Sequence, residues 1–557
     1  MTCKRLIGLL LAAALLAAQL PALAEDTLDV TALYKNKDVD GAWSAADAEW
    51  IDLNGQEGQV LISGKGDYVL SGTLSGQIVV DAPENEKVRL ILNGVTVTSP
   101  QGPAIYEKQA DKLIVTLAEG SENFLTDGPA VTDEDDVIGA ALYAEDDLSI
   151  NGNGSLTASG TQKHGIQSKA DLIIAGGKIT VTAQKDGLRG RNSVLLLAGE
   201  VDLTVGGDGI TATRADAEGK GWVVLSGGSV TVKSGDGAGA VRASANSRGG
   251  FGGRRGWDDW GASATAADSG ESQKAVKAAT DLTVLNGNFT FNCADDGLHA
   301  VNVTVAGGVF SILSGDDGMH ADEEMKISGG VIDIAQCYEG IEGKNVTISG
   351  GDVRVTSSDD GVNVSGGSDG SGFGGWGRGG GFAASGSGGM LTISGGSLSV
   401  NAGGDGLDSN GSILISGGVV GVWAATTAGE GAIDFNGSGT VSGGTLIVAS
   451  TGGVMRDTLG LTGQSIMALS VSGSAGETVI LTDQAGAVLG SFTPGKAFDT
   501  LLVSSASLQS GQSFIVRSGD KTLYSGAATD SVTSATAVGN GFDSGFGSGR
   551  NRNRKGR

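Results

Sequence analysis

Apolar and polar residues alternate along most of this chain, in short runs separated by glycine-rich turns. Between residues 281 and 364 the runs recur as one unit: an alternating triplet, a glycine-centred turn, a second alternating run, and an acidic residue followed by glycine. The closing glycines are Gly297, Gly318, Gly340 and Gly361, so each repeat is roughly 21–22 residues long. A fixed period of this length is typical of a solenoid.

Alternation with period two places successive side chains on opposite faces of a strand, so each repeat predicts short β-strands and no helix. Three such strands per turn, each paired with its equivalent in the next turn, would form a parallel β-helix. Such a solenoid grows by about 4.8 Å per rung. We expect the glycines to supply the positive φ angles of sharp corners. The predicted fold class is therefore all-β.

The ends of the chain differ from the repeats. Residues 1–24 contain a basic start, an apolar run and Ala22-Leu23-Ala24, which together predict a secretory signal peptide. Residues 25–58 form a leader without a repeat, and we expect the β-helix to span 59–452. Residues 453–530 alternate without the acidic corner and predict a small C-terminal β cap, followed by a low-complexity tail at 531–557.

Two intervals between closing glycines are too long for one rung. Gly237 and Gly297 lie 60 residues apart, and Gly361 and Gly406 lie 45 apart. Each excess matches a Gly/Ser-rich stretch, at about 238–277 and 366–389, which predicts an insertion within one rung. Both stretches follow an acidic-Gly corner, so we expect both to leave the solenoid along the same edge. They contain three candidate carbohydrate-binding residues: Trp257, Trp260 and Trp376. Plain flexible loops are the alternative.

Composition narrows the class of partner. The chain has 98 glycines without a Gly-X-Y period, which excludes collagen. Its 63 acidic and 37 basic residues give a net charge of −26, which argues against nucleic acid and favours divalent cations. With the signal peptide, and without a second apolar run long enough for a membrane span, we expect a secreted, extracellular or surface-associated monomer. Cys293 and Cys337 lie two rungs apart, about 10 Å by rung spacing. That is too far for a disulfide, so both are predicted to be buried thiols.

The acidic corners are the candidate metal ligands. Stacking the rungs would place successive carboxylates about 5 Å apart, where one Ca²⁺ could bridge them. The candidate ligands are Asp186, Asp208, Asp295, Asp296, Asp316, Asp317, Asp359 and Asp360. The alternative is that Asp-Gly serves only as turn chemistry.

Paired carboxylates can also hydrolyse glycosides, but a catalytic pair should interrupt the pattern and not recur in every rung. His299 and His320 follow the acidic corners of successive rungs and are expected to be stacked polar neighbours. His164 occupies a corner position where other rungs have an acid. No catalytic triad, CxxC motif, P-loop or nucleotide fingerprint is present in the sequence.

Several motifs resemble one known family. They are Gly66-Asp67-Tyr68-Val69-Leu70-Ser71-Gly72, Leu90-Ile91-Leu92-Asn93-Gly94-Val95, Asp146-Asp147-Leu148-Ser149-Ile150-Asn151-Gly152-Asn153-Gly154, His164-Gly165-Ile166-Gln167-Ser168-Lys169 and Asp186-Gly187-Leu188-Arg189-Gly190. These residues are similar to secreted bacterial carbohydrate-binding domains of clostridial cellulose degraders. The resemblance implies a right-handed parallel β-helix similar to family 9 polysaccharide lyases, with bound Ca²⁺ and affinity for cellulose and acidic pectic sugars. Ala170-Asp171 departs from the pattern where two acids are expected.

These observations predict a non-catalytic, calcium-stabilised binder of plant cell-wall polysaccharide, with Arg189 as a further sugar contact. One alternative is a Ca²⁺-dependent pectate-lyase-like enzyme, for which Lys169, Arg189 and Arg191 are the candidate bases. The other alternative is a structural cell-surface adhesin.

Overall fold

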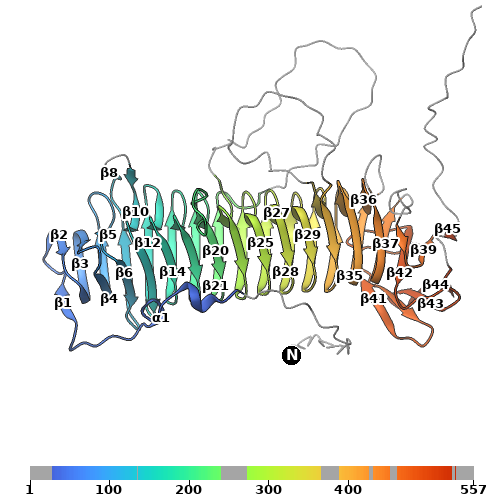
Figure 1. The fold of residues 1–557 in the computed structure, drawn as a ribbon, viewed down its shortest axis with the longest axis horizontal. Coiled ribbons are helices and arrows are strands. Elements are labelled where there is room, and N and C mark those ends of the chain that lie inside the picture. The colour runs from blue at the N-terminus through green and yellow to red at the C-terminus, as the bar shows by residue number, and fades with distance from the viewer. Residues whose placement is uncertain are drawn as a thin grey trace, which may run out of the picture.

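The structure is a computed structural model that describes residues 28–133, 136–239, 272–365, 388–425, 431–451, 461–529 and 533–534. Its strands wind into an elongated parallel β-helix, with the first and last rungs at opposite ends of the long axis (Figure 1). The predicted fold class is confirmed. The predicted signal peptide, most of both insertions and almost all of the C-terminal tail lie outside the described residues.

Successive rungs contribute three strands each, and equivalent strands pair in parallel to form faces A, B and C. Face A comprises β5 (Ile105–Gln109), β10 (Ala140–Ala144), β13 (His164–Ser168), β16 (Leu188–Gly190), β19 (Ile210–Ala212), β22 (Val276–Ala278), the starts of β25 (Leu298–Val305), β27 (Met319–Ile327) and β29 (Ile341–Ile348), then β31 (Val362–Val364), β34 (Leu407–Ser409) and β36 (Ile433–Phe435). Face B comprises β6 (Lys112–Leu117), β11 (Asp147–Gly152), β14 (Asp171–Ile174), β17 (Ser193–Leu196), β20 (Trp222–Leu225), β23 (Asp281–Val284), the ends of β25, β27 and β29, β32 (Met390–Ile393) and the starts of β35 (Ser412–Ala425) and β37 (Gly439–Thr451). Face C comprises β7 (Glu122–Thr126), β12 (Ser155–Gly160), β15 (Lys178–Ala183), β18 (Glu200–Val205), β21 (Ser229–Ser234), β24 (Asn288–Cys293), β26 (Val309–Ser314), β28 (Val331–Cys337), β30 (Asp352–Ser357), β33 (Ser397–Asn401) and the ends of β35 and β37.

Apolar residues stack on themselves inside the solenoid. Leu188 pairs in register with Ile210, which pairs with Val276, and all three are fully buried. Each such side chain contributes about 1.5–3 kcal/mol relative to leaving it in water. Cys293 and Cys337 lie in this core as free thiols, as predicted. The core is one continuous column, so each rung stabilises its neighbours.

Glycine meets two different requirements at the turns of the solenoid, and the expected positive φ is confirmed at the Gly-Gly turns. The second glycine of each Gly-Gly turn has a positive φ, as at Gly308 (97°) and Gly330 (95°). The glycines after the corner acids that stack along the solenoid do not have a positive φ: Gly187, Gly209, Gly297, Gly318, Gly340, Gly361 and Gly406. Gly237, which follows Asp236 before the first insertion, is an exception with a φ of 81°. At the stacked corners, a Cβ on Gly297 would lie 2.5 Å from the carbonyl oxygen of Gly318, and a Cβ on Gly318 would lie equally close to that of Gly340. The acid-Gly corner therefore needs glycine for close packing of successive rungs.

The solenoid begins at β1 (Glu49–Asp52), earlier than the predicted residue 59. β1 and β2 (Glu57–Ile62) pair in parallel with β3 (Gly66–Asp81), which pairs with β4 (Lys87–Thr98). The preceding segment, with η1 (Val30–Leu33) and α1 (Asn36–Val39), runs back along the solenoid (Figure 1). It packs on outward apolar residues of face B, where Lys112 bonds Asp38 at 2.9 Å.

Antiparallel strands end the solenoid, as the C-terminal pattern predicts. β42 (Thr500–Ser505) pairs antiparallel with the end of β37 and with β39 (Ile466–Leu469). β38 (Thr462–Gly463) and β45 (Thr533–Ser534) add short pairings. A separate sheet of β41 (Val488–Phe492), β40 (Val479–Asp483), β43 (Ser513–Ser518) and β44 (Lys521–Ala527) packs its core on Trp423 and Ile447. These strands cover the last edge that parallel rungs would leave open.

The two predicted insertions leave the solenoid at different places. The first lies between β21 and β22, before the corner of its rung, whereas the second lies between β31 and β32. The predicted common edge is therefore wrong. The boundary at 277 is also too late, because the amide of Ala275 bonds the next corner and β22 pairs with β19 and β25. A short antiparallel hairpin, β8 (Val131–Asp133) with β9 (Asp136–Ile138), projects from an earlier rung.

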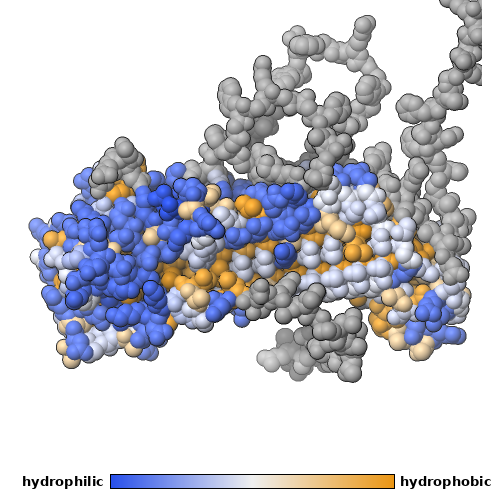
Figure 2. All heavy atoms as spheres, in the orientation of Figure 1, coloured by the Kyte–Doolittle hydropathy of each residue, from blue (hydrophilic) through white to orange (hydrophobic). Residues whose placement is uncertain are grey.

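The outer surface varies along the solenoid. In the view of Figure 2, hydrophilic residues cover most of the N-terminal rungs, whereas the middle rungs show bands of neutral and hydrophobic colour. Exposed aliphatic residues on face C include Val309 and Val331, which pair in register. In the part of the chain that the structure describes, no helix has the length and apolar character needed to cross a membrane.

Candidate ligand-binding face

Two rows of polar side chains run along face A, one at the corner before each strand and one three residues later. The corner row consists of His164, Asp186, Asp208, Lys274, Asp296, Asp317, Glu339, Asp360 and Asp405. The strand row consists of Gln167, Arg189, Thr211, Lys277, His299, His320, Glu342, Asn363, Asp408 and Asp434. Rungs are about 4.8 Å apart, so each row is a ladder of functional groups along the axis.

Corner carboxylates bind the backbone of the following rung. Oδ1 of Asp186 accepts the amide of Asp208 at 3.1 Å, and Oδ1 of Asp296 accepts the amide of Asp317 at 3.1 Å. Asp360 likewise accepts the amide of Asp405 at 2.7 Å. These acids therefore connect successive rungs. The alternative prediction, that Asp-Gly serves only as turn chemistry, gave the acids a structural role within one rung only.

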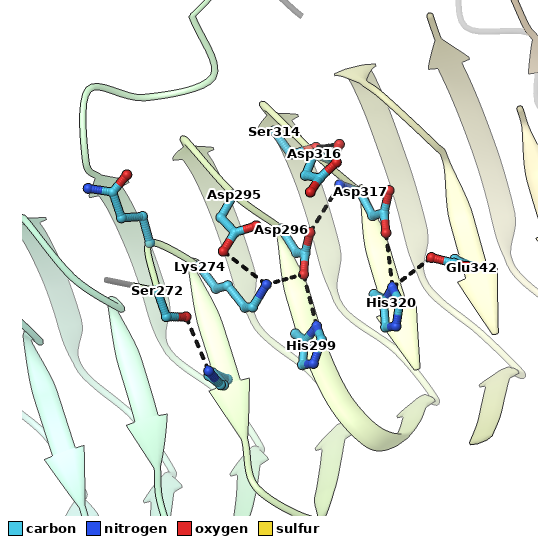
Figure 3. Close-up of polar contacts among 12 residues, drawn as sticks. Ser272, Lys274, Asp295, Asp296, His299, Ser314, Asp316, Asp317, His320 and Glu342 are labelled. Carbon is cyan, nitrogen blue, oxygen red and sulfur yellow. Dashed lines mark hydrogen bonds and ion pairs between the residues drawn. The ribbon is translucent and has the colours of Figure 1, made fainter. Parts of the chain in front are cut away.

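Lys274 contacts the candidate calcium ligands Asp295 and Asp296, which was not predicted from the sequence. Its Nζ lies 2.5 Å from Oδ2 of Asp296 and 2.9 Å from Oδ2 of Asp295 (Figure 3). Burial alone would raise the pKa of Asp296, but Lys274 and His299 outweigh it and hold this pKa below its ordinary value. Asp295, Asp296 and Asp316 have carboxylate oxygens within 4.8 Å of one another, and the lysine ammonium already neutralises part of that cluster.

The histidines stack as predicted. The rings of His299 and His320 are 4.7 Å apart and nearly parallel, at 12°. His299 bonds Oδ2 of Asp296 through Nδ1 at 2.9 Å, and His320 bonds Oδ2 of Asp317 in the same way at 2.9 Å. Nδ1 of His320 also lies 2.8 Å from Oε2 of Glu342 (Figure 3). His164 pairs similarly with Asp186, at 3.2 Å.

The C-terminal end of face A is acidic. Burial first, and then the charge of Asp405, raise the pKa of Asp360 to about 9. Asp359 is bonded by the hydroxyl of Tyr338. Asp405 and Asp408 come from one rung and Asp434 from the next, with carboxylate oxygens within 4.8 Å of one another.

The N-terminal end of face A is basic. Arg189 donates from Nη1 to Oδ2 of Asp186 at 2.5 Å, and together with His164 it keeps the pKa of the buried Asp186 low, against the effect of burial. Lys169 is half-buried, and burial, then Arg191 and Arg189, lower its pKa. Arg191 is exposed. Burial, and then the charge of Asp186, raise the pKa of Asp208 to about 6.

The structure thus separates the predicted site residues. Asp186 and Asp208 lie at the basic end, Asp295 to Asp317 lie around Lys274 and His320, and Asp359 and Asp360 lie at the acidic end. Trp257, Trp260 and Trp376 lie outside the described residues. Four residues of these clusters were not predicted from the sequence: Lys274, Glu342, Asp408 and Asp434. A signal existed for Glu342, which follows Glu339 by the spacing that separates His299 from Asp296.

Comparison with known proteins identifies the family of the chain. A family model described as carbohydrate-binding domain-containing protein matches residues 56–318 and 317–541. A carbohydrate-binding domain-containing protein of Acetivibrio thermocellus is 40% identical over 135 residues, which are 24% of this chain and 47% of that protein. The chain therefore spans about half the length of that relative.

A solved structure, that of the polysaccharide lyase-like protein from C. thermocellum as a gadolinium derivative, aligns with 52% of this chain and 96% of its own, at 26% identity and a TM-score of 0.35. The matches of the family model cover most of the solenoid and the C-terminal strands. The chain belongs to the family of carbohydrate-binding domain-containing proteins.

Proposed function

We propose that the protein is a secreted, non-catalytic binder of plant cell-wall polysaccharide that prefers acidic pectic chains to cellulose. The observation that carries the proposal is the strand row of face A, which has a polar residue at every rung from Gln167 to Asp434. The residues of this row that are partly exposed are Gln167, Arg189, Lys277, His299, Asp408 and Asp434, whereas Thr211, His320, Glu342 and Asn363 are buried. Rungs lie about 4.8 Å apart, so an extended polysaccharide along the row can contact several of the partly exposed groups. Membership of a carbohydrate-binding family supports a glycan as the ligand.

Charge on face A supports the choice of an acidic glycan. Lys169, Arg189 and Arg191 lie close enough for the two arginines to lower the pKa of the lysine, after the larger effect of burial. Charge-assisted hydrogen bonds from such groups to uronate carboxylates are stronger than neutral ones. Arg189 is already bonded to Asp186, so the exposed Arg191 and Lys169 are the main proposed contacts. The net charge of −26 opposes a polyanion at long range, and this contact is therefore local and sensitive to salt.

Calcium is proposed at the acidic end of the same face. Asp405, Asp408 and Asp434 offer only oxygen atoms, which Ca²⁺ prefers, at separations that one ion can bridge. The cluster of Asp295, Asp296 and Asp316 is less suitable because Lys274 already lies against it. An ion at the acidic end can also bind a uronate carboxylate of a polysaccharide lying along the row.

A lyase is the second candidate, and Lys169 is the observation that favours it. A β-elimination requires a base to remove the proton next to the uronate carboxylate, and lysine is one of the residues that can act as a general base. Burial, Arg191 and Arg189 lower the pKa of Lys169. The arginines would stabilise the charge that develops on the carboxylate.

One experiment separates these functions. The mature chain is applied to an array of plant cell-wall glycans, and is separately incubated with polygalacturonate and Ca²⁺ while the absorbance of unsaturated product is followed. We expect retention on de-esterified pectic glycans without any rise in absorbance. A rise that Lys169→Ala abolishes would identify the lyase instead. If no glycan on the array retains the chain, the result would favour a structural adhesin.

A further inference from the structure

We propose that Asp317, His320 and Glu342 form a site for one first-row divalent transition-metal ion, with Zn²⁺ or Co²⁺ as suitable occupants. This site is separate from the proposed calcium cluster. It lies inside the wall of face A, between the rungs of β27 and β29, and does not depend on any glycan being bound.

The three side chains converge on one point. His320 and Glu342 are paired in register on β27 and β29, and Asp317 lies three residues before His320. Nδ1 of His320 is 2.9 Å from Oδ2 of Asp317 and 2.8 Å from Oε2 of Glu342 (Figure 3). Zinc sites in proteins are usually tetrahedral with bonds of about 2.0–2.1 Å, so their ligand atoms lie about 3.3–3.4 Å apart. The observed separations are shorter by about 0.5 Å, so an ion enters this site with a small outward movement of the carboxylates.

Hydrogen bonding alone satisfies this arrangement poorly. Nδ1 of an imidazole carries one hydrogen at most, yet two carboxyl groups approach it at full hydrogen-bond distance. All three side chains are buried, with exposures of 3% for Asp317, 0% for His320 and 8% for Glu342. In the described part of the chain, neither carboxylate pairs with a lysine or arginine. A divalent ion would satisfy the three ligand atoms at once and neutralise both acids.

The second ring nitrogen of His320 supports an ion at this place. Nε2 of His320 is buried without a hydrogen-bond partner, and Oδ1 of Asp322 lies 3.6 Å from it. A metal-bound histidine commonly directs its second nitrogen to a carboxylate, which is the position Asp322 occupies. Oδ1 of Asn363, which pairs in register with Glu342 on the next strand, is also buried without a partner.

The ligand set selects the class of metal. One imidazole nitrogen with two carboxylate oxygens suits zinc, cobalt, iron or nickel, whereas Ca²⁺ and Mg²⁺ favour oxygen alone. The ion would cross-link neighbouring rungs in the interior of the wall. Its expected role is therefore structural.

The test uses the full, untagged chain after removal of metals with a chelator. Zn²⁺ is added, unbound metal is removed by gel filtration and retained zinc is measured by mass spectrometry; Co²⁺ binding is followed by its visible absorption. We expect one retained equivalent, and at least about a tenfold loss of affinity in His320→Gln and in Glu342→Gln. His164→Gln, which alters another buried histidine–aspartate pair on face A, should retain zinc as the unaltered chain does.

Circular dichroism verifies that each variant is folded, and Glu342→Gln preserves the side-chain shape if His320→Gln does not fold. Zinc retention that is unchanged in folded Glu342→Gln would overturn the proposal. So would the absence of retained Zn²⁺ and of a Co²⁺ spectrum in the unaltered chain.

Discussion

At the scale of single residues, most of the corner acids of face A accept a hydrogen bond from the backbone of the solenoid itself. Asp186, Asp296 and Asp360 all accept the backbone amide of the next corner. A hydrogen bond to a charged acceptor, as at Asp186 and Asp296, contributes about 1.5–3 kcal/mol, which is enough to favour an acid at such corners without any ligand. A recurring acid is therefore weak evidence for a metal, and convergence of several ligand atoms is the stronger criterion.

The sequence predicted the repeating acids but not the residue that neutralises them. Lys274 occupies a corner position, yet it is followed by Ala275 and not by glycine, and a long Gly/Ser-rich stretch separates it from the preceding rung. Asp236-Gly237 matches the acid-Gly pattern, so the pattern predicted the corner of this rung there. Asp408 and Asp434 were missed because they belong to the strand row, whose spacing becomes visible only once the rungs are aligned.

A pH-dependent prediction concerns Glu107, which is fully buried on β5. Its Oε2 accepts the amide of Asp146 at 3.1 Å, whereas Oε1 has no partner. Burial is the main cause that raises its pKa from 4.5 to about 8. Between these values the folded state holds a proton that the unfolded state has lost, so stability falls as pH rises, by at most about 1.4 kcal/mol per pH unit.

Glu107→Gln removes this titration and keeps an oxygen acceptor for the amide of Asp146. We expect the melting temperature of the variant to exceed that of the unaltered chain by a margin that grows from pH 5 to pH 8. Thermal unfolding in buffers across that range measures the margin. A margin that is independent of pH would show that the pKa of Glu107 is not raised in the folded state.

At the scale of elements, the outward residues of face B explain the position of the N-terminal segment. Val30 and Leu33 pack with Ile173, Leu195 and Val224, one outward residue from each of three successive rungs. The strands of these rungs are apolar at nearly every position, whereas later strands alternate, as in Leu282-Thr283-Val284. Continuous apolar runs mark strands that are covered on both faces. The sequence therefore shows that these strands are covered. It does not show which segment covers them, because the N-terminal segment has no repeat that would align it with the rungs.

The corrected insertion boundary can be tested with two deletions. Removing residues 240–271 keeps β21 and β22, which are both held by pairing with neighbouring rungs, and keeps Lys274. We expect this variant to unfold cooperatively, with a change in stability on the order of 1 kcal/mol from the shorter connection. Thermal unfolding followed by circular dichroism provides the measurement.

Removing residues 238–277 is the matched comparison. This deletion also takes away Lys274 and leaves the fully buried Asp296 without its ammonium partner. Loss of one partner from a buried ion pair costs roughly 3–5 kcal/mol, so this variant should be much less stable than the first. Equal stability of the two variants would contradict both the corrected boundary of the insertion and the stabilising role of Lys274 beside Asp296.

At the scale of the whole molecule, face A changes from basic to acidic along the solenoid. Its acidic end supports a calcium prediction. A Ca²⁺ bound only by the folded state stabilises it by about 2.7 kcal/mol at a hundredfold excess over Kd. We expect EDTA to lower the melting temperature at neutral pH, and Ca²⁺ to restore it better than Mg²⁺, which gives up its water reluctantly.

Asp408→Asn combined with Asp434→Asn should remove most of the response to Ca²⁺. Asp333→Asn, on the exposed surface of face C, should leave the response unchanged. Restoration by Ca²⁺ of equal size in the double variant would exclude the acidic end as the calcium site.

The central claim, that face A binds acidic polysaccharide, is tested most directly by native gel electrophoresis with polygalacturonate in the gel. We predict retardation of the full chain that is reduced severalfold in a Lys169→Ala/Arg191→Ala variant. The control, Lys233→Ala/Lys326→Ala, removes the same charge from exposed positions on faces C and B and should migrate as the unaltered chain does. Fully methyl-esterified pectin should cause much less retardation. Equal mobility of the unaltered chain with and without polygalacturonate, or equal retardation of both double variants, would contradict the account.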